Sequence, residues 1–208
     1  MNPHQINPHQ HKTGYEHTYQ SIVHKLAECD FNEASQRLGF DPPVNGTIKV
    51  NFLGREYAIN SEGVTGTDGL PSDPCCRGTL IYYITSKGRG EPEDTYWLPQ
   101  NFSPIRIGSG DINWMSAPLV KAIGNDPGKL KTAMSKLGAI QDGQSESIWI
   151  YSALPKVKLQ ITFLEADEDF PCEIILKLDK GTGRFFEFEQ LAFLCGCFMD
   201  AVTGLCKS

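Results

Sequence analysis

The histidines, which carry most acid–base chemistry near neutral pH, are confined to one end of this 208-residue chain. All five lie within the first 24 residues: His4, His9, His11, His17 and His24. The rest of the chain therefore lacks the side chain on which serine–histidine catalysis, cysteine–histidine catalysis and histidine-ligated zinc depend. His17 and His24 are two helical turns apart, about 10 Å along the axis, which is too far to share one ion.

The cysteines are the second group with chemical potential. There are seven, an odd number with no CxxC pair: Cys29, Cys75, Cys76, Cys172, Cys195, Cys197 and Cys206. The N-terminal residues are polar and do not resemble a secretory signal. We therefore expect reduced thiols and a cytoplasmic location.

Cys75 and Cys76 are the candidate reactive thiols. They follow Pro74 in the first turn of a predicted helix and precede Arg77. A helix N-terminus and a neighbouring cation both favour a reactive thiolate. No base for them is evident in the sequence, and a pair of half-buried structural thiols is the alternative.

Cys195 and Cys197 are the chelator-like pair of the chain. On a helix their side chains would point about 200° apart, so we predict core thiols and no metal site. An iron–sulfur cluster needs about four converging thiolates. The sequence leaves open whether Cys75, Cys76, Cys172 and a further cysteine converge, and the cofactor is unknown.

The densest group of carboxylates lies at residues 165–169, at the tip of a predicted hairpin. Its spacing is not that of a calcium-binding helix–loop–helix. Asp167, Glu168, Asp169 and the following Phe170 are the most charged and exposed-looking segment, although a merely solvated tip is the alternative. We nominate these four residues as a candidate contact surface for a partner.

Composition bounds the function further. The net charge is −6, with 25 acidic and 19 basic residues, and the basic residues are scattered. A nucleic-acid groove is therefore not expected, and no apolar run is long enough to predict a membrane span. The polar, proline-containing residues 1–12 are predicted to be a disordered, histidine-rich tail.

The hydrophobic pattern predicts a single α+β domain over residues 13–208, with helices packed on a largely antiparallel sheet. Helices are expected near residues 15–28, 30–38, 74–86, 114–123, 126–137 and 187–202. Strands are expected near residues 47–52, 56–59, 96–98, 147–151, 157–164 and 173–178. The last two strands should form a hairpin around the acidic tip.

The final predicted helix is apolar around most of its circumference. One side carries Leu191, Leu194 and Phe198, and the opposite side carries Phe193 and Cys197. Such a helix is either deeply buried or docks a second subunit. The sequence therefore allows a homodimer through this helix.

Several stretches, in this order along the chain, resemble a bacterial and archaeal family called domain of unknown function 3786. They are Phe52-Leu-Gly-Arg-Glu-Tyr57, Pro118-Leu-Val to Gly124-Asn-Asp-Pro127, Leu154-Pro-Lys-Val157 and Asp167-Glu-Asp-Phe-Pro171. The resemblance covers residues 15–205. It departs at Tyr96-Trp-Leu-Pro-Gln-Asn101, where the family has Phe-Arg-Glu-Leu-Pro-Gly-Gly after the tryptophan.

The resemblance implies an accessory role near iron–sulfur or corrinoid enzymes of anaerobes, and no catalytic residues. Some relatives carry an iron–sulfur domain ahead of this one, where the present chain has only its histidine-rich tail. We expect a non-enzymatic binding module for a protein partner or small ligand. The alternatives are a small enzyme with a cleft lined by Trp97, Trp114, Arg106 and carboxylates, or a thiol-based metal- or cluster-binding protein.

Overall fold

The computed structural model describes residues 8–103, 113–124, 126–168 and 170–208. Its α-helices are α1 (Pro8–Ile22), α2 (Phe31–Leu38), α3 (Pro74–Thr85), α4 (Asn113–Ile123), α5 (Pro127–Leu137) and α6 (Phe188–Lys207). Short 3-10 helices are η1 (Val23–Glu28), η2 (Pro99–Phe102) and η3 (Lys180–Arg184). The strands are β1 (Ile48–Phe52), β2 (Arg55–Asn60), β3 (Gly63–Gly66), β4 (Tyr96–Trp97), β5 (Ile140–Asp142), β6 (Ser145–Leu154), β7 (Val157–Leu164) and β8 (Glu173–Asp179).

The fold is α+β, as the sequence predicts, with its strands in two antiparallel sheets instead of one. The smaller sheet has the order β1-β2-β3, and the larger has the order β4-β8-β7-β6-β5. Leu53 and Gly54 form the two-residue turn between β1 and β2, both with positive φ, which suits the twist of a hairpin. The predicted hairpin around the acidic segment is confirmed as β7 and β8.

Local capping signals place the helix boundaries well. Asp30 accepts hydrogen bonds from the backbone of Asn32 and Glu33 at the start of α2, and Asp73 caps α3 through the backbone N–H of Cys75. α1 begins at Pro8, so residues 8–12, which we predicted to be disordered, belong to a helix. The remainder of that tail lies outside the described residues.

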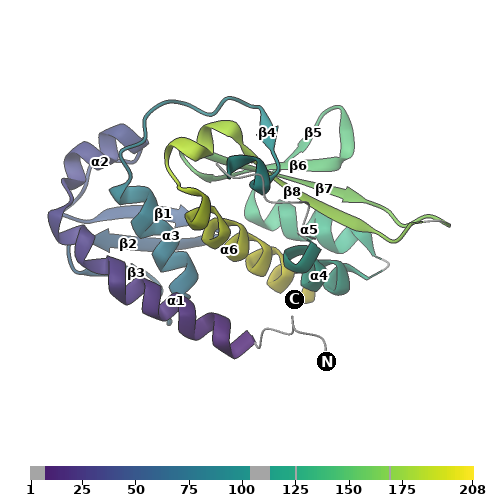
Figure 1. Cartoon of the computed structure of the whole chain (residues 1–208), viewed down its shortest axis with the longest axis horizontal. Helices are drawn as coiled ribbons and strands as arrows, with labels where there is room; N and C mark the ends of the chain where they lie inside the picture. The colour runs from purple at the N-terminus through teal and green to yellow at the C-terminus, as the bar shows by residue number, and fades with distance from the viewer. Residues whose placement is uncertain (1–7, 104–112, 125, 169) are drawn as a thin grey trace.

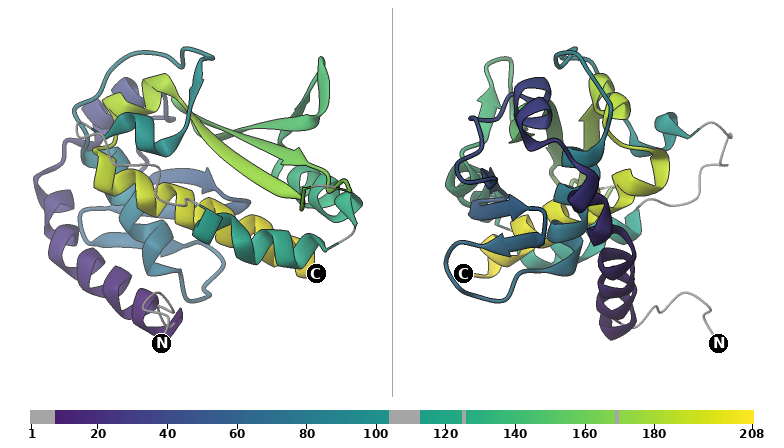
Figure 2. Two further views of the ribbon diagram at one scale, coloured as in Figure 1. Left: turned by 45° about the vertical axis from the view of Figure 1, so that its right-hand side comes forward. Right: turned by 90° about the vertical axis from the view of Figure 1, so that its left-hand side faces the viewer.

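Helix α6 is the centre of the molecule. Figures 1 and 2 show it running through the middle, with α1 and α3 to one side and the five-stranded sheet to the other. Helices α3, α4 and α5 all pack against it. Phe193, on its second apolar side, contacts the rings of Tyr15 and Tyr82. Cys197 is buried and Phe193 is half-buried, so the second apolar side of α6 packs within the chain, and a homodimer through this helix stays a prediction.

The length and hydropathy of α6 also match those of a membrane-spanning helix. Its apolar side chains, however, belong to the hydrophobic core, where Leu194, Phe198 and Val202 are fully buried. A helix that is apolar on all sides is expected at the centre of a globular core. This position gives α6 contacts with segments that are far apart in the sequence, and the candidate site lies on it.

Candidate functional site

Two thiols from distant parts of the chain meet between α3 and α6. Cys75 lies in the first turn of α3, and Cys197 lies near the middle of α6. Their Sγ atoms are 2.7 Å apart although the residues are 122 positions apart in the sequence. Both are 3 % exposed and both are free thiols. From the sequence, Cys75 is predicted to be a reactive thiol and Cys197 a core residue, so the contact between the two thiols is not predicted.

The hydrogen bonds define which of the two thiols is the donor and which is the acceptor. The Cys197 thiol donates to Cys75 Sγ, and the Cys75 thiol donates to the carbonyl oxygen of Phe193 at 3.3 Å. The hydroxyl of Thr79, one helical turn after Cys75, lies 3.6 Å from Cys197 Sγ and donates to the Cys75 carbonyl. Cys75 Sγ is therefore an acceptor at the N-terminus of α3, and Cys197 is the donor beside it.

Two tyrosines close the cluster. The Tyr15 hydroxyl, from α1, lies near Cys75, and the Tyr57 hydroxyl, from β2, lies near Cys76, close enough for the thiols to raise the pKa of each tyrosine. Cys76 is half-buried, in contrast to the buried Cys75. We call Cys75, Cys76, Cys197, Tyr15 and Tyr57 the thiol–tyrosine cluster.

Gly196 of α6 lies beside this cluster. A Cβ atom at this position would lie 3.4 Å from the Tyr15 hydroxyl and 4.0 Å from Cys75 Sγ. Gly196 is itself only half-buried. A side chain at this position would therefore contact the cluster directly.

Burial dominates the electrostatics of the cluster. It raises the pKa of Cys197 well above its ordinary value, and the adjacent Cys75 and Cys76 raise it further. It also raises the pKa of Tyr15 and of Tyr57, again with contributions from the neighbouring thiols. Cys195, on the next face of α6, has its pKa raised to about 12 by burial and by Cys75. Cys197 and both tyrosines are consequently protonated donors at neutral pH.

Arg77, the cation that we expected beside the thiols, makes its contacts with α1 instead. Arg77 turns toward α1, where it forms an ion pair with Glu16 at 2.7 Å and lies 3.9 Å above the ring centroid of Tyr19. Arg77 therefore does not supply the neighbouring cation from which the sequence predicted a reactive Cys75, and that reactivity stays a prediction. The hydrogen bonds named above for the two thiol groups, all within the described structure, involve no carboxylate or histidine, and the Asp73 carboxylate accepts from the backbone N–H of Cys75 instead.

The cluster has too few converging ligands for a metal. In the described parts of the chain, no group of three or more histidine, cysteine, aspartate or glutamate side chains could hold an ion. Cys29 donates to the Ile84 carbonyl at 3.9 Å, and Cys172 lies beside Phe163 and Glu165 at another cavity. The arrangement instead brings two sulfurs into position for two-electron oxidation to a disulfide.

The acidic tip is separate from these thiols. Figure 1 shows the ends of β7 and β8 at the opposite edge of the molecule from α3. Asp167 and Glu168 are exposed, and Phe170 is 70 % exposed. The Phe170 N–H donates to the Asp167 carboxylate at 2.7 Å, which fixes the turn. Asp169, the remaining residue of the nominated surface, lies outside the described residues.

The cleft residues considered for an enzyme can be placed only in part. Trp97 lies on β4 at the edge of the larger sheet, with its ring against Phe102 and 5.2 Å from Lys180 Nζ. Arg106 and the side chain of Trp114 lie outside the described parts of the chain. The described structure therefore gives Trp97 a packing role at the sheet edge.

Comparison with known proteins identifies a family and no more. The model of the family named domain of unknown function (DUF3786) matches residues 30–201, which is most of the chain, and the chain belongs to this family. Neither the curated proteins nor the solved structures contain a match. The region matched includes Cys75, Cys76 and Cys197 but begins after Tyr15.

Proposed function

We propose that this protein is an accessory module that responds to oxidants by reversible disulfide formation between Cys75 and Cys197. The observation that carries the proposal is the 2.7 Å separation of their two sulfur atoms. A disulfide has an S–S bond of about 2.05 Å, so the two sulfur atoms are about 0.7 Å from bonding distance. The proposal combines the accessory role expected from the resemblance with the thiol chemistry that the sequence left as an alternative.

The two thiols have different roles in the proposed reaction. Cys75 accepts the hydrogen bond from Cys197, and we assign it the role of the sulfur that attacks the oxidant. Hydrogen bonds to the charged form stabilise a thiolate. Cys197, whose pKa is raised, remains a thiol and serves as the resolving group.

The oxidant must be small because Cys75 is 3 % exposed. A hydroperoxide meets this requirement. The Cys75 thiolate attacks the terminal peroxide oxygen, the O–O bond breaks, and with one proton the products are a Cys75 sulfenic acid and an alcohol or water. The Cys197 sulfur then attacks Cys75 Sγ, and its proton leaves with the hydroxyl as water. Overall, two thiols and one peroxide give one disulfide, one water and one alcohol or second water.

The cellular setting is part of the same proposal. In the cytoplasmic location expected from the free thiols, the pair would be reduced at rest and oxidised only on exposure. Iron–sulfur and corrinoid enzymes of anaerobes, near which the resemblance placed this family, require protection from oxidants. An accessory module with a peroxide-responsive dithiol would suit that role.

The test is thiol chemistry on the purified, reduced protein. Treatment with one equivalent of hydrogen peroxide should lower the number of titratable thiols in the denatured chain from seven to five. Peptide mapping should then identify a Cys75–Cys197 disulfide, and a dithiol reductant should restore the reduced protein. Cys75→Ser should abolish disulfide formation, whereas Cys197→Ser should trap a sulfenic acid at Cys75.

Cys29→Ser is the matched control, because Cys29 is a half-buried thiol on another element and its loss should leave the reaction unchanged. Circular dichroism checks that each variant is folded. Selective oxidation of Cys29 or Cys172, with Cys75 and Cys197 left as thiols, would refute the proposal.

The acidic tip supports a second proposal, a partner-binding surface. Phe170 exposes a large apolar side chain between carboxylates, which fits a partner with an apolar pocket surrounded by basic residues. Cross-linking from a cysteine placed at residue 168 would identify the partner. With that purified partner, Phe170→Ser should weaken binding at all salt concentrations, and Asp167→Asn with Glu168→Gln should weaken it mainly at low salt. Affinity that is unchanged in both variants would exclude this surface.

A further inference from the structure

A cavity of about 380 Å³ lies where the C-terminus of α3 meets the junction of η3 and α6. It is lined by Thr85, Ser86 and Lys87 from the end of α3, by Lys25 from η1, and by residues 183–187 and 190 around the start of α6. Its size is within the range of small-molecule sites. This cavity is distinct from the thiol–tyrosine cluster and plays no part in the proposed oxidation.

The cavity wall is rich in unused positive charge. Lys25 and Lys87 are exposed and have no ion-pair partner in the described structure. Arg184, also in the wall, is already neutralised by its ion pair with Glu93. Glu187 is the one acidic residue lining the cavity. The cavity wall therefore carries two lysines without ion-pair partners and one carboxylate, although the protein as a whole has a net charge of −6. This local excess of positive charge favours binding of an anion.

Neutral donors accompany these lysines. The Ser86 hydroxyl is buried and has no hydrogen-bond partner in the described structure. Gln190 uses its side-chain oxygen to accept from the Glu187 N–H, so its amide N–H groups remain to donate. Tyr82, also in the lining, stays protonated because burial and the charge of Glu187 raise its pKa. The cavity thus offers donors and few acceptors, which suits phosphate or carboxylate oxygens.

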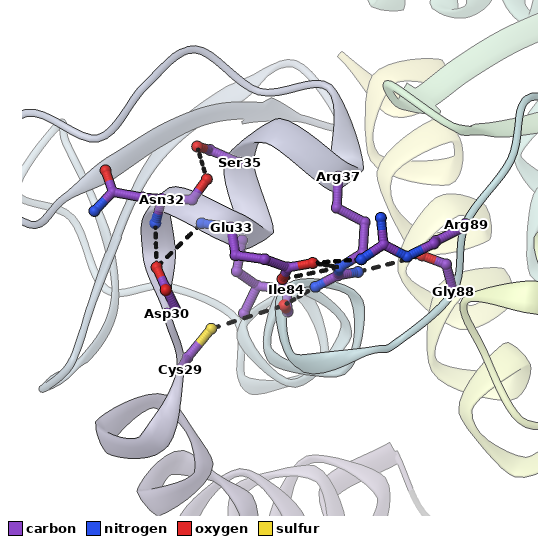
Figure 3. A network of polar contacts seen from close by, with 9 residues as sticks. All are labelled: Cys29, Asp30, Asn32, Glu33, Ser35, Arg37, Ile84, Gly88 and Arg89. Carbon is purple, nitrogen blue, oxygen red and sulfur yellow. Dashed lines mark hydrogen bonds and ion pairs between the residues drawn. The ribbon is translucent and has the colours of Figure 1, made fainter.

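A buried arginine fixes the segment that supplies Ser86 and Lys87. The Arg37 side chain is 3 % exposed, and it donates to the carbonyl oxygens of Ile84 and Gly88 on either side of that segment. Figure 3 shows Arg37 reaching these two carbonyls, with Glu33 pairing to it and to Arg89. One wall of the cavity is therefore held in place without a ligand, as in sites that are largely formed in advance.

We propose that this cavity binds a small organic anion through a phosphate or carboxylate group held by Lys25, Lys87 and the donors of Ser86, Tyr82 and Gln190. The rings of Tyr82 and Phe185 in the lining provide apolar contact for the body of the ligand.

The test is isothermal titration of the reduced, full-length protein with inorganic phosphate, succinate, adenosine 5′-monophosphate and uncharged adenosine. We expect saturable binding of at least one of the three anions and none of adenosine. Preference for succinate over the two phosphates would assign a carboxylate ligand, and the reverse a phosphate ligand. Lys25→Gln with Lys87→Gln should weaken binding at least tenfold, and Glu187→Gln should strengthen it.

The matched control is Lys129→Gln with Lys136→Gln, which removes the same charge from a different, more open cavity at α5 and the end of α6. Binding in this control should equal that of the unmodified chain. Absence of saturable binding for every anion would overturn the proposal, as would equal loss in both lysine pairs or loss in the control alone. Thermal unfolding establishes that the variants are folded.

Discussion

Oxidation of the thiol pair should stabilise the protein by an amount that can be worked out from the structure. A disulfide between Cys75 and Cys197 would close a loop of 122 residues in the unfolded chain. The chain-entropy relation then gives about 16 cal/mol/K, or about 4.9 kcal/mol of added unfolding free energy at 25 °C. For a domain of this size, each kcal/mol raises Tm by about 2–4 °C, so the oxidised protein should melt roughly 10–20 °C higher.

The assay compares urea and thermal unfolding of fully reduced and peroxide-oxidised protein, with the disulfide confirmed by mass spectrometry. A thermodynamic cycle supplies a second, independent measurement. If the disulfide stabilises the native state by about 4.9 kcal/mol, the native couple must have a reduction potential about 100 mV more negative than the same pair in the denatured chain. Both values can be measured against a glutathione buffer.

Unfolding of the oxidised protein at or below the temperature of the reduced protein would refute the predicted stabilisation by the disulfide. That outcome would mean that closing the sulfur–sulfur distance distorts α3 or α6 by more than the loop entropy offsets. A gain in stability without the matching change in potential would show that another disulfide had formed. The reduced Cys75→Ser protein, treated with peroxide, provides the baseline for both measurements.

Three further predictions concern the residues around the two sites. Because the pKa of Cys195 rises from its ordinary 9.0 to about 12 in the folded state, the folded chain holds its proton longer than the unfolded chain. Cys195 alone should therefore lower the unfolding free energy by about 1.4 kcal/mol per pH unit between pH 9 and 12, in addition to the contributions of Cys197 and the buried tyrosines. Cys195→Ala should make the total slope in urea titrations shallower by about that amount. Arg37→Ala should cost about 2–3 kcal/mol by removing the charged donor to the carbonyls of Ile84 and Gly88, and should weaken anion binding in calorimetry. The exposed Lys131→Ala should do neither. Gly196→Ala should raise the unfolding free energy by up to about 1 kcal/mol through helix propensity, because the added Cβ would make only ordinary contacts. The same change should slow peroxide oxidation of Cys75 in a timed thiol assay, and an unchanged rate would show that the oxidant does not reach Cys75 past this residue.

The parts of the fold that the sequence predicts are those with a local signal. Asp30, Asp73 and Asp126 each accept a backbone N–H at a helix start, and Gly39 and Gly138 end helices in the left-handed conformation. The alternation along β7 likewise marks a strand with one buried face. Such signals reside within a few residues and can be found without the fold.

The strands that sequence reasoning missed lack such signals. β3 consists of two residues between two glycines, and it exists because β2 pairs with it from Tyr57 to Asn60. β5 is three residues long, and its Ile140 is 75 % exposed, so no buried face marks it. Both strands form because a neighbouring strand pairs with them. The local pattern of apolar and polar residues does not reveal which strand that neighbour is.

The candidate site shows the same division between local and long-range information. The position of Cys75 after Asp73 and Pro74 predicted a thiol in the first turn of a helix, and the structure places it there. Its partner, Cys197, had only the features of a core residue on an apolar helix, and the distance between the two is a property of how α3 packs on α6. Tyr15 lies in the helix expected near residues 15–28, and no local pattern connects it to Cys75.

The central position of α6 connects the two sites that we propose. Phe193 accepts the Cys75 hydrogen bond with its carbonyl oxygen, while its ring contacts Tyr82, which lines the anion cavity. Disulfide formation would consume the proton of that hydrogen bond and draw the first turn of α3 toward α6. The same helix begins at the cavity, so a change in its position relative to α3 would reach the wall that Tyr82 forms. Any effect of oxidation on anion affinity must then be matched by an equal effect of the anion on the stability of the disulfide, because coupling between two binding equilibria is reciprocal.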